Sequence, residues 1–457
     1  MSVFVAFWAT IAGMISRRNF AGAAAGAFAA SSYAQISGAN DRVRLGFIGV
    51  GNRGGNLLNM TKEFADQQVV AVCDLLDPLL DKAVASAGTN PERFKDFRRL
   101  LDRKDIDAVV IATPDHWHAL MMIAAAQAGK DVYVEKPLSL TVVEGRRMVQ
   151  VAEETKRVVQ VGIHRRSSPF CQEATEIVRS GGIGQVTMAR CGVALNTWPS
   201  GIGHPPDGPA PAGLDWDLYL GPAPEAPYNE NRHLFLYRWF FDYAGGQLTD
   251  NGVHFLDLIH MGLGQNRPSS VAALGGKYAL HDNSTVPDTF QALWEYPSGL
   301  MVNFFQSSCN SAPFSNTKPL LAEFRGTKGT MNIYFDSWEI VPEQVSSEPF
   351  PARGPLETDA ARAYRSSMKP AMEARSGAGS ADPRLHIRNF LDCIKSRNKP
   401  NCDIETAHRS TTTANIATIA YKTRNRLDWD ADREMFSNDL SANELLHYPY
   451  RAPWKLG

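Results

Sequence analysis

Short apolar runs alternate with amphipathic stretches over the part of the chain that follows residue 41. The runs typical of buried strands are 42–50, 67–77, 107–114, 131–137 and 157–164. Between them lie stretches in which apolar residues recur at helical spacing. A regular order of strand, helix and strand is typical of a parallel, doubly wound sheet. The pattern therefore predicts an α/β domain over residues 42–163.

Farther along, the pattern indicates a second α/β domain over residues 164–385. Eight prolines in residues 199–227 predict a long loop without regular structure. A glycine-led helix is expected over residues 241–264. The expected strands are 269–280, 288–308, 320–335 and 337–343. Because tight turns join these strands, we expect an open, largely antiparallel sheet. The polar stretch 345–385 is predicted to be a loop, and residues 386–457 to be C-terminal helices and a tail that pack back on the body.

Composition and charge argue against several classes of protein, among them nucleic-acid-binding and zinc-binding proteins. The chain has 457 residues and a formal net charge of −1, so no strong field is expected for nucleic acid or anionic membrane. Its six cysteines are scattered and none forms a CxxC pair, which argues against a zinc knuckle or a disulfide framework. We therefore predict a soluble globular protein without a metal centre, not a nucleic-acid-binding protein.

The N-terminus has the pattern of an export signal. Arg17 and Arg18 precede an uncharged, alanine-rich run, and "SYA" before Gln35 is typical of a cleavage site. Residues 1–34 therefore resemble a twin-arginine signal, which exports folded proteins to the periplasm. Either Met1 or Met14 can be the true start. If the arginine pair is a coincidence beside a flexible tail, the protein is cytoplasmic, and a retained membrane anchor is a minor alternative.

A dinucleotide-binding loop follows the first predicted strand. The sequence GVGNRG over residues 49–54 matches GxGxxG, and Asp74 ends the second predicted strand. The loop residues predicted to bind the cofactor are Gly49, Gly51, Asn52, Arg53 and Gly54. Asp74 is placed to bind ribose hydroxyls and to repel a 2′-phosphate, so NAD is favoured over NADP. The alternative is a glycine-rich turn that packs a strand on a helix without a ligand.

Candidate acid–base residues lie at two places in the chain. Lys136 stands at the carboxyl end of the fourth predicted strand, where open α/β sheets bind ligands. Asp250 and His254 are four residues apart and share one face of the predicted helix. The alternatives are a surface lysine, a capping aspartate, a core histidine, an ion pair or a metal site. No second ligand set accompanies a metal site here.

Together, these motifs resemble those of the Gfo/Idh/MocA oxidoreductases: GxGxxG with a following acid, then "TPDHWHA", "EKP" and "GGQLTDNGVHFLD". The resemblance implies a Rossmann domain followed by an α/β domain whose open sheet builds the substrate site and often a homo-oligomer interface. It implies Lys136, Asp250 and His254 as the catalytic group and a cis Lys136–Pro137 bond. The residues implied along the nicotinamide half of NAD are Thr113, Pro114, His116, Glu135 and Lys136.

Other side chains are candidates for contacts with the substrate. His164 and Arg166 follow the fifth predicted strand and are expected to face substrate or cofactor. Tyr237 and Arg238 are candidates for stacking on a sugar ring or for hydrogen bonds to it. The sequence therefore favours a small carbohydrate or polyol as the substrate.

The expected reaction is hydride transfer from a sugar or polyol carbon to NAD. His254, oriented by Asp250, would take the hydroxyl proton while Lys136 polarises the oxygen. Outside the cytoplasm free NAD is scarce, so an exported enzyme would carry its cofactor tightly bound and regenerate it in place.

Several other functions stay open at this point. A sugar–sugar oxidoreductase oxidises one sugar and reduces another. An NAD-dependent glycosidase works by transient oxidation, elimination, hydration and re-reduction. The remaining alternatives are a non-catalytic sugar or redox sensor and an ordinary cytoplasmic dehydrogenase.

Overall fold

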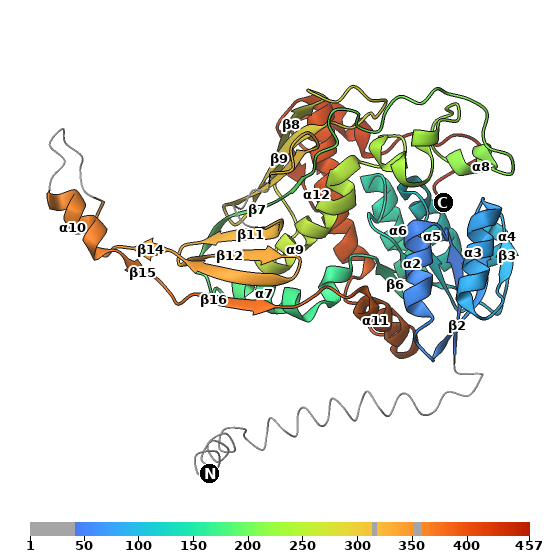
Figure 1. Cartoon of the computed structure of the whole chain (residues 1–457), viewed down its shortest axis with the longest axis horizontal. Coiled ribbons are helices and arrows are strands. Elements are labelled where there is room, and N and C mark those ends of the chain that lie inside the picture. The colour runs from blue at the N-terminus through green and yellow to red at the C-terminus, as the bar shows by residue number, and fades with distance from the viewer. Residues whose placement is uncertain (1–41, 313–317, 351–358) are drawn as a thin grey trace, which may run out of the picture.

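The computed structural model describes residues 42–312, 318–350 and 359–457, which form two sheets with their covering helices (Figure 1). The predicted signal over residues 1–34, its arginine pair and both candidate start methionines lie outside the described residues. In the ranges that are described, no helix has both the length and the apolar character needed to cross a bilayer.

The first sheet is parallel, with the strand order β3-β2-β1-β4-β5-β6. Its strands are β1 (Val43–Ile48), β2 (Gln67–Cys73), β3 (Glu92–Phe94), β4 (Ala108–Ile111), β5 (Asp131–Val134) and β6 (Val159–Val161). The helices between them are α2 (Asn52–Thr61), α3 (Asp77–Ala87), α4 (Phe97–Leu101), α5 (His118–Gln127) and α6 (Val142–Thr155). The predicted doubly wound α/β domain is confirmed, whereas the helices α3 and α4 and the short edge strand β3 were not identified individually from the sequence.

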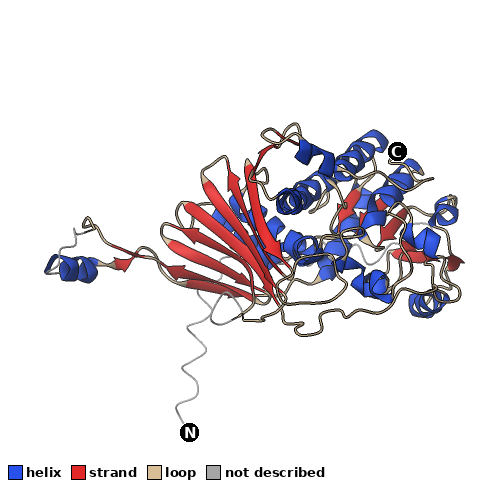
Figure 2. Ribbon diagram, turned by 90° about the horizontal axis from the view of Figure 1, so that it is seen from above, coloured by secondary structure: helices blue, strands red, loops and turns tan. Residues whose placement is uncertain are grey.

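The second sheet has ten strands in the order β16-β13-β12-β11-β7-β10-β9-β8-β17-β18 and lies beside the first (Figure 2). Its strands are β7 (Val186–Ala194), β8 (Ser270–Gly276), β9 (Thr289–Tyr296), β10 (Leu300–Ser307), β11 (Leu320–Gly326), β12 (Gly329–Tyr334), β13 (Ser337–Pro342), β16 (Arg375–Ala378), β17 (Leu427–Asp430) and β18 (Met435–Phe436). Among the strand pairs described for this sheet, β7 and β10 pair in parallel and the others are antiparallel. The prediction of a largely antiparallel sheet is therefore confirmed.

The two faces of this sheet differ in what covers them. Helices α7 (Pro169–Arg179), α9 (Val253–Leu263) and α12 (Ile404–Thr423) share one buried hydrophobic cluster with its strands. On the other face, side chains such as Leu274, Leu293 and Met301 are exposed. In β9 the burial alternates residue by residue, as expected for a sheet that packs on one face only.

Two segments differ from the sequence-based expectation. The stretch 345–385, expected to be a loop, contains β14 (Gln344–Val345), α10 (Asp359–Ser367), β15 (Lys369–Pro370) and β16. The first three of these form an arm that projects away from the first sheet (Figure 1). The proline-rich loop contains the short helix α8 (Trp216–Leu220), which Asp215 caps by accepting a hydrogen bond from the Leu218 amide. The remaining short helical turns are η1 (Asp115–Trp117), η2 (His164–Ser167), η3 (Glu230–Arg232), η4 (Leu234–Trp239), η5 (Leu248–Gly252) and η6 (Ser441–Leu446).

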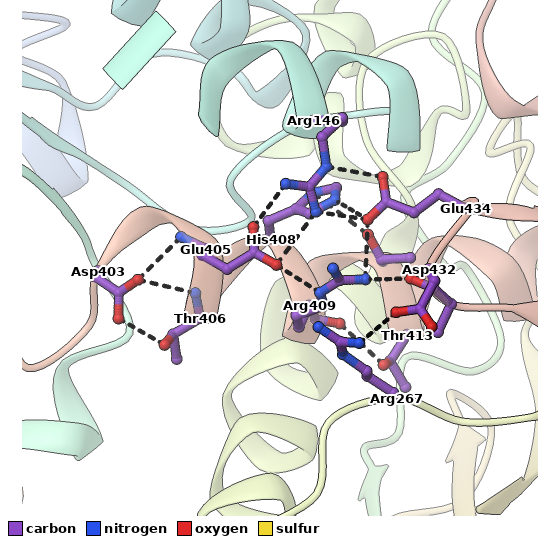
Figure 3. A network of polar contacts seen from close by, with 12 residues as sticks. Arg146, Arg267, Asp403, Glu405, Thr406, His408, Arg409, Thr413, Asp432 and Glu434 are labelled. Atoms are coloured by element: carbon purple, nitrogen blue, oxygen red, sulfur yellow. Dashed lines mark hydrogen bonds and ion pairs between the residues drawn. The ribbon is translucent and has the colours of Figure 1, made fainter. Parts of the chain in front are cut away.

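Two features join the sheets. Helix α11 (Pro383–Ser396) places Ile387, Phe390 and Leu391 in the same apolar cluster as residues of β1 and α2. A charged network then ties α6 to α12 (Figure 3). Arg146 of α6 binds Glu405 (2.8 Å) and Glu434 (2.7 Å), and His408 and Arg409 of α12 also contact Glu434.

Candidate active site

The glycine loop between β1 and α2 is closely packed. Gly49 has φ +80°, and a Cβ there would lie 2.8 Å from the backbone of Ala112. A Cβ on Gly54 would lie 1.8 Å from the Gly49 carbonyl oxygen, so strand and helix can approach only if both residues are glycine. Gly51 has only Leu79 within 4 Å of its Cβ position and faces a cleft of about 410 Å³.

This cleft has the lining that a dinucleotide requires. Gly49, Gly51, Asn52 and Arg53 line one end together with Asp74. The Asp74 carboxylate accepts hydrogen bonds from the amides of Val50 (2.9 Å) and Leu76 (3.1 Å). Burial raises the pKa of this carboxyl, and the backbone hydrogen bonds oppose that effect. Each of its oxygens has an acceptor position left for a ribose hydroxyl.

Other residues that line the cleft fit the same ligand. Thr113 and Pro114 are among them, as the family resemblance implied, and the Thr113 hydroxyl oxygen is buried with no hydrogen-bond partner among the described residues. Lys95, from a segment far along the chain, also lines the cleft. Its ammonium is 2.8 Å from the Asp77 carboxylate and donates to the Leu75 carbonyl (2.7 Å). That pairing opposes its use for a 2′-phosphate, consistent with NAD.

A segment of the second domain covers the cleft. Residues 233–238, here called the clasp, contribute all of their side chains except that of Leu236 to the same lining as the glycine loop. The hydroxyl of Tyr237 donates to buried Asp115 (3.0 Å), and the Arg238 guanidinium stacks on Phe235, 3.9 Å from the ring centroid. Tyr237 and Arg238, expected to contact the sugar, thus line the cofactor cleft.

Lys136 lies at the end of β5, just before a cis Lys136–Pro137 bond. Its ammonium donates to both the carboxylate (2.5 Å) and the backbone carbonyl (3.0 Å) of Asp250. Arg238 lies 3.5 Å from the same carboxylate. Burial alone would raise the pKa of Asp250, but the charges of Lys136 and Arg238 outweigh it and hold the pKa below its ordinary value. Asp250 is therefore an ionised partner of the lysine.

His254 lies one helical turn beyond Asp250, at the start of α9. Its ring is buried and lies edge-on to that of His164, with 5.0 Å between the ring centroids. Burial, reinforced by the nearby charges of Arg165 and Lys136, holds the pKa of His254 well below its ordinary value. Its Nδ1 has no hydrogen-bond partner in the described part of the chain, and Asp250 faces Lys136 and Arg238 instead. The site thus contains a neutral imidazole beside a lysine–aspartate pair.

The remaining predicted residues lie around this group, not in the cleft. His116 is fully buried behind the cleft, with Nε2 3.1 Å from the Tyr219 carbonyl oxygen, and burial lowers its pKa to about 3. The buried carboxylate of Glu135 accepts from Arg53 (2.7 Å), which links the glycine loop to the EKP segment. Arg166 binds the buried carboxylate of Asp257 at 2.8 Å and so has a structural partner, although it was expected to face substrate or cofactor.

Comparisons with known proteins agree with this geometry. The model "Oxidoreductase family, NAD-binding Rossmann fold" matches residues 43–163, and "Oxidoreductase family, C-terminal alpha/beta domain" matches 175–275 and 355–456. The WlbA dehydrogenase from Bordetella pertussis, solved with NADH and UDP-GlcNAcA, has a TM-score of 0.61 at 20% identity over 85% of this chain and 99% of that one. A levoglucosan dehydrogenase solved with NADH and levoglucosan gives the same values. At this identity the two likenesses concern the fold.

Curated relatives match a shorter part of the chain. A glycosyl hydrolase family 109 protein of Shewanella sp. (strain W3-18-1) is 39% identical over 125 residues, and one of Shewanella sp. (strain MR-4) is 40% identical over 124 residues. The matched stretch is about a quarter of this chain and 27% of each relative. The two family models together cover most of the chain, including the whole first sheet and part of the second. The chain belongs to the Gfo/Idh/MocA family of oxidoreductases, with an NAD-binding Rossmann domain and a C-terminal α/β domain.

Proposed function

We propose that this protein is an NAD-dependent oxidoreductase that acts on a hydroxyl-bearing carbon of a carbohydrate or polyol. The observation that carries the proposal is the contact of Lys136 with both the carboxylate and the carbonyl of Asp250. This contact holds the lysine against η5, the helical turn directly before the helix that bears His254. It brings an ammonium, a carboxylate and a neutral imidazole together beside the end of a dinucleotide cleft.

Each of the three residues has a distinct role. NAD, when bound, supplies the hydride acceptor. The Lys136 ammonium, held in place by Asp250, donates a hydrogen bond to the reacting hydroxyl and stabilises the negative charge that develops on its oxygen. His254 accepts the hydroxyl proton, because its lowered pKa keeps the imidazole neutral at physiological pH. In the reverse direction the same groups return the proton to a carbonyl oxygen.

The position of the clasp is a reason to expect that NAD exchanges slowly. The clasp belongs to the second domain, yet it lines the same cleft as the glycine loop and is anchored by the bond from Tyr237 to Asp115. Moving Tyr237 away from the cleft requires this hydrogen bond to break. We therefore infer that NAD stays bound between turnovers, which suits a reaction that restores the cofactor within the site.

A glycosidase is the second candidate, favoured by the family 109 glycosyl hydrolase relatives. In this scheme a ring carbon is oxidised only transiently, and the C–H bond beside it becomes acidic. Elimination and water addition then cleave the glycosidic bond before the carbon is reduced again. The same three residues would serve the oxidation and the reduction.

One experiment tests both candidates. The full chain is purified without added cofactor, its NAD content is measured, and it is incubated with a panel of aryl glycosides and free sugars in D2O. Bound NAD, sugar release and solvent deuterium on the ring without net NADH would support the glycosidase. Stoichiometric NADH that depends on added NAD would support a dehydrogenase. A Lys136→Met variant should lose at least ~100-fold in turnover and keep its NAD. Equal activity in the variant would refute the proposed role of the lysine.

We propose further that the protein is exported in folded form and forms a homo-oligomer. Export rests on the Arg17–Arg18 pair, the alanine-rich run and the cleavage pattern before Gln35. Oligomerisation rests on the apolar side chains exposed on the open face of the second sheet, such as Leu274 and Met301. Fractionation of the native host and light scattering of the purified protein test these two proposals.

A further inference from the structure

A second cavity, of about 220 Å³, lies next to the active site but is separate from it. Within the described chain it shares no lining residue with the cofactor cleft: Pro114 lines the cleft, and the next residue, Asp115, lines this cavity. Neither Lys136, Asp250 nor His254 lines it. We call it the inner cavity and define it by Asp115, Thr141, Asp242, Asn415, Lys422 and Tyr448.

Hydrogen-bond donors without acceptors face the inner cavity. The Nδ2 atom of Asn415 is buried without a hydrogen-bond partner among the described residues, and the side chain is only 7% exposed. The Tyr448 hydroxyl is likewise buried and unpartnered there. Lys422 stands at the rim, 4.7 Å from the centroid of the Phe241 ring, and has no ion pair within the described ranges. Buried donors of this kind normally bind a ligand or ordered water.

Acceptors and apolar groups complete the lining. Asp115 and Asp242 each have one carboxylate oxygen engaged, by the Tyr237 hydroxyl (3.0 Å) and by Arg232 (2.9 Å). The other oxygen of each has no hydrogen bond to any described residue. Apolar side chains such as Leu140 and Ile419 cover another part of the wall. The cavity thus combines donors, acceptors and an apolar surface.

This lining selects a class of ligand. An anion would meet the two carboxylates, and a cation would meet Lys422 at the rim. A neutral polyhydroxylated molecule satisfies both kinds of group, since each hydroxyl donates one hydrogen bond and accepts others. The volume is many times the roughly 10–15 Å³ that one water needs. We propose that the inner cavity is a binding site for a free monosaccharide or small polyol, distinct from the place where the reacting sugar binds.

The position of the cavity links it to turnover. Thr249 and Pro137 line it, and they adjoin Asp250 and Lys136 in the chain. Asp115 lines it and also anchors the clasp through Tyr237. A ligand in the inner cavity would contact the groups that hold both the catalytic lysine segment and the cover of the cofactor cleft.

Calorimetric titration of the full chain, with its native cofactor content, tests this proposal. The probes are glucose, galactose, N-acetylglucosamine and myo-inositol. We expect saturable binding of at least one probe, at least tenfold weaker in Asn415→Leu and in Lys422→Met. The matched control, Lys136→Met, should bind that probe within twofold of the wild type, because this lysine does not line the inner cavity.

Two results would overturn the proposal. One is the absence of saturable binding for all four probes. The other is binding that is lost in Lys136→Met but kept in both cavity variants, which would assign it to the catalytic site. Lys422 is exposed at the rim, so its methionine variant tests the site even if Asn415→Leu does not fold. Loss of turnover in Lys136→Met without any probe binding would leave the proposed function standing and refute only this second site.

Discussion

Replacement of Glu434 by glutamine removes the negative charge at the centre of the network that joins α6 to α12 (Figure 3). The Glu434 carboxylate, only 10% exposed, contacts Arg146 (2.7 Å), His408 (2.8 Å) and Arg409 (3.0 Å). Removing one partner of a buried ion pair costs about 3–5 kcal/mol. Glu405 remains to pair with both arginines, so we expect the variant to lose roughly 3 kcal/mol of unfolding free energy.

The pKa of Glu434 leads to the same magnitude and adds a pH signature. Burial acts to raise this pKa, but the bonds from His408 and Arg146 outweigh it and lower the pKa from 4.5 to about 2. A displacement of this size corresponds to roughly 3 kcal/mol. Because the folded-state pKa is depressed, this stabilisation is present above about pH 4.5 and is lost as the pH falls toward 2.

The assay is urea unfolding followed by tryptophan fluorescence, for wild type and Glu434→Gln at several pH values. The control is Asp81→Asn, which breaks the exposed pair with Arg93 and should cost no more than about 0.5 kcal/mol. A wild-type advantage below 0.5 kcal/mol at pH 7 would refute the reasoning. So would an advantage that stays constant between pH 7 and pH 3.

Three further predictions concern the site. Gly54→Ala should purify with at least ~10-fold less NAD, since the added Cβ would lie 1.8 Å from the Gly49 carbonyl oxygen. The control Gly55→Ala, whose Cβ has its nearest neighbour at 3.4 Å, should keep its NAD, and equal loss in both would contradict the steric argument. Tyr237→Phe should release NAD several-fold faster in an isotope-exchange assay, and an unchanged rate would remove the clasp from cofactor retention. Asp250→Asn should lower turnover by ~100-fold or more with unchanged NAD content, whereas parallel loss of both would indicate misfolding.

The site residues that could be predicted from the sequence are those that belong to short motifs at the ends of predicted strands. The glycine loop, Asp74 and Lys136 each stand at the end of a predicted strand, and the parallel sheet brings those ends together. The fold class could be predicted for the same reason, because strand and helix periods are local. β7, with its polar and glycine-containing sequence, lacks the alternation that would have identified it.

The missed parts depend on contacts between distant segments. Tyr237 and Asp115 are 122 positions apart, and no local pattern indicates that one covers the cofactor cleft by bonding to the other. The spacing of Asp250 and His254 suggested a bonded pair, but the approach of Lys136 gave the carboxylate a charged partner. Arg166 was expected near the ligand because it follows the fifth predicted strand, and no sequence signal identifies Asp257 as its buried partner.

The late position of α11 in the sequence affects how the first domain folds during translation. The last strand of the first sheet ends at Val161, yet α11, which covers β1 and α2, begins at Pro383. During translation the nucleotide domain therefore emerges from the ribosome with this apolar surface uncovered, and it is completed only when nearly the whole polypeptide has been synthesised. A fragment ending after β6 should aggregate when expressed alone, and stable loading with NAD should follow chain termination.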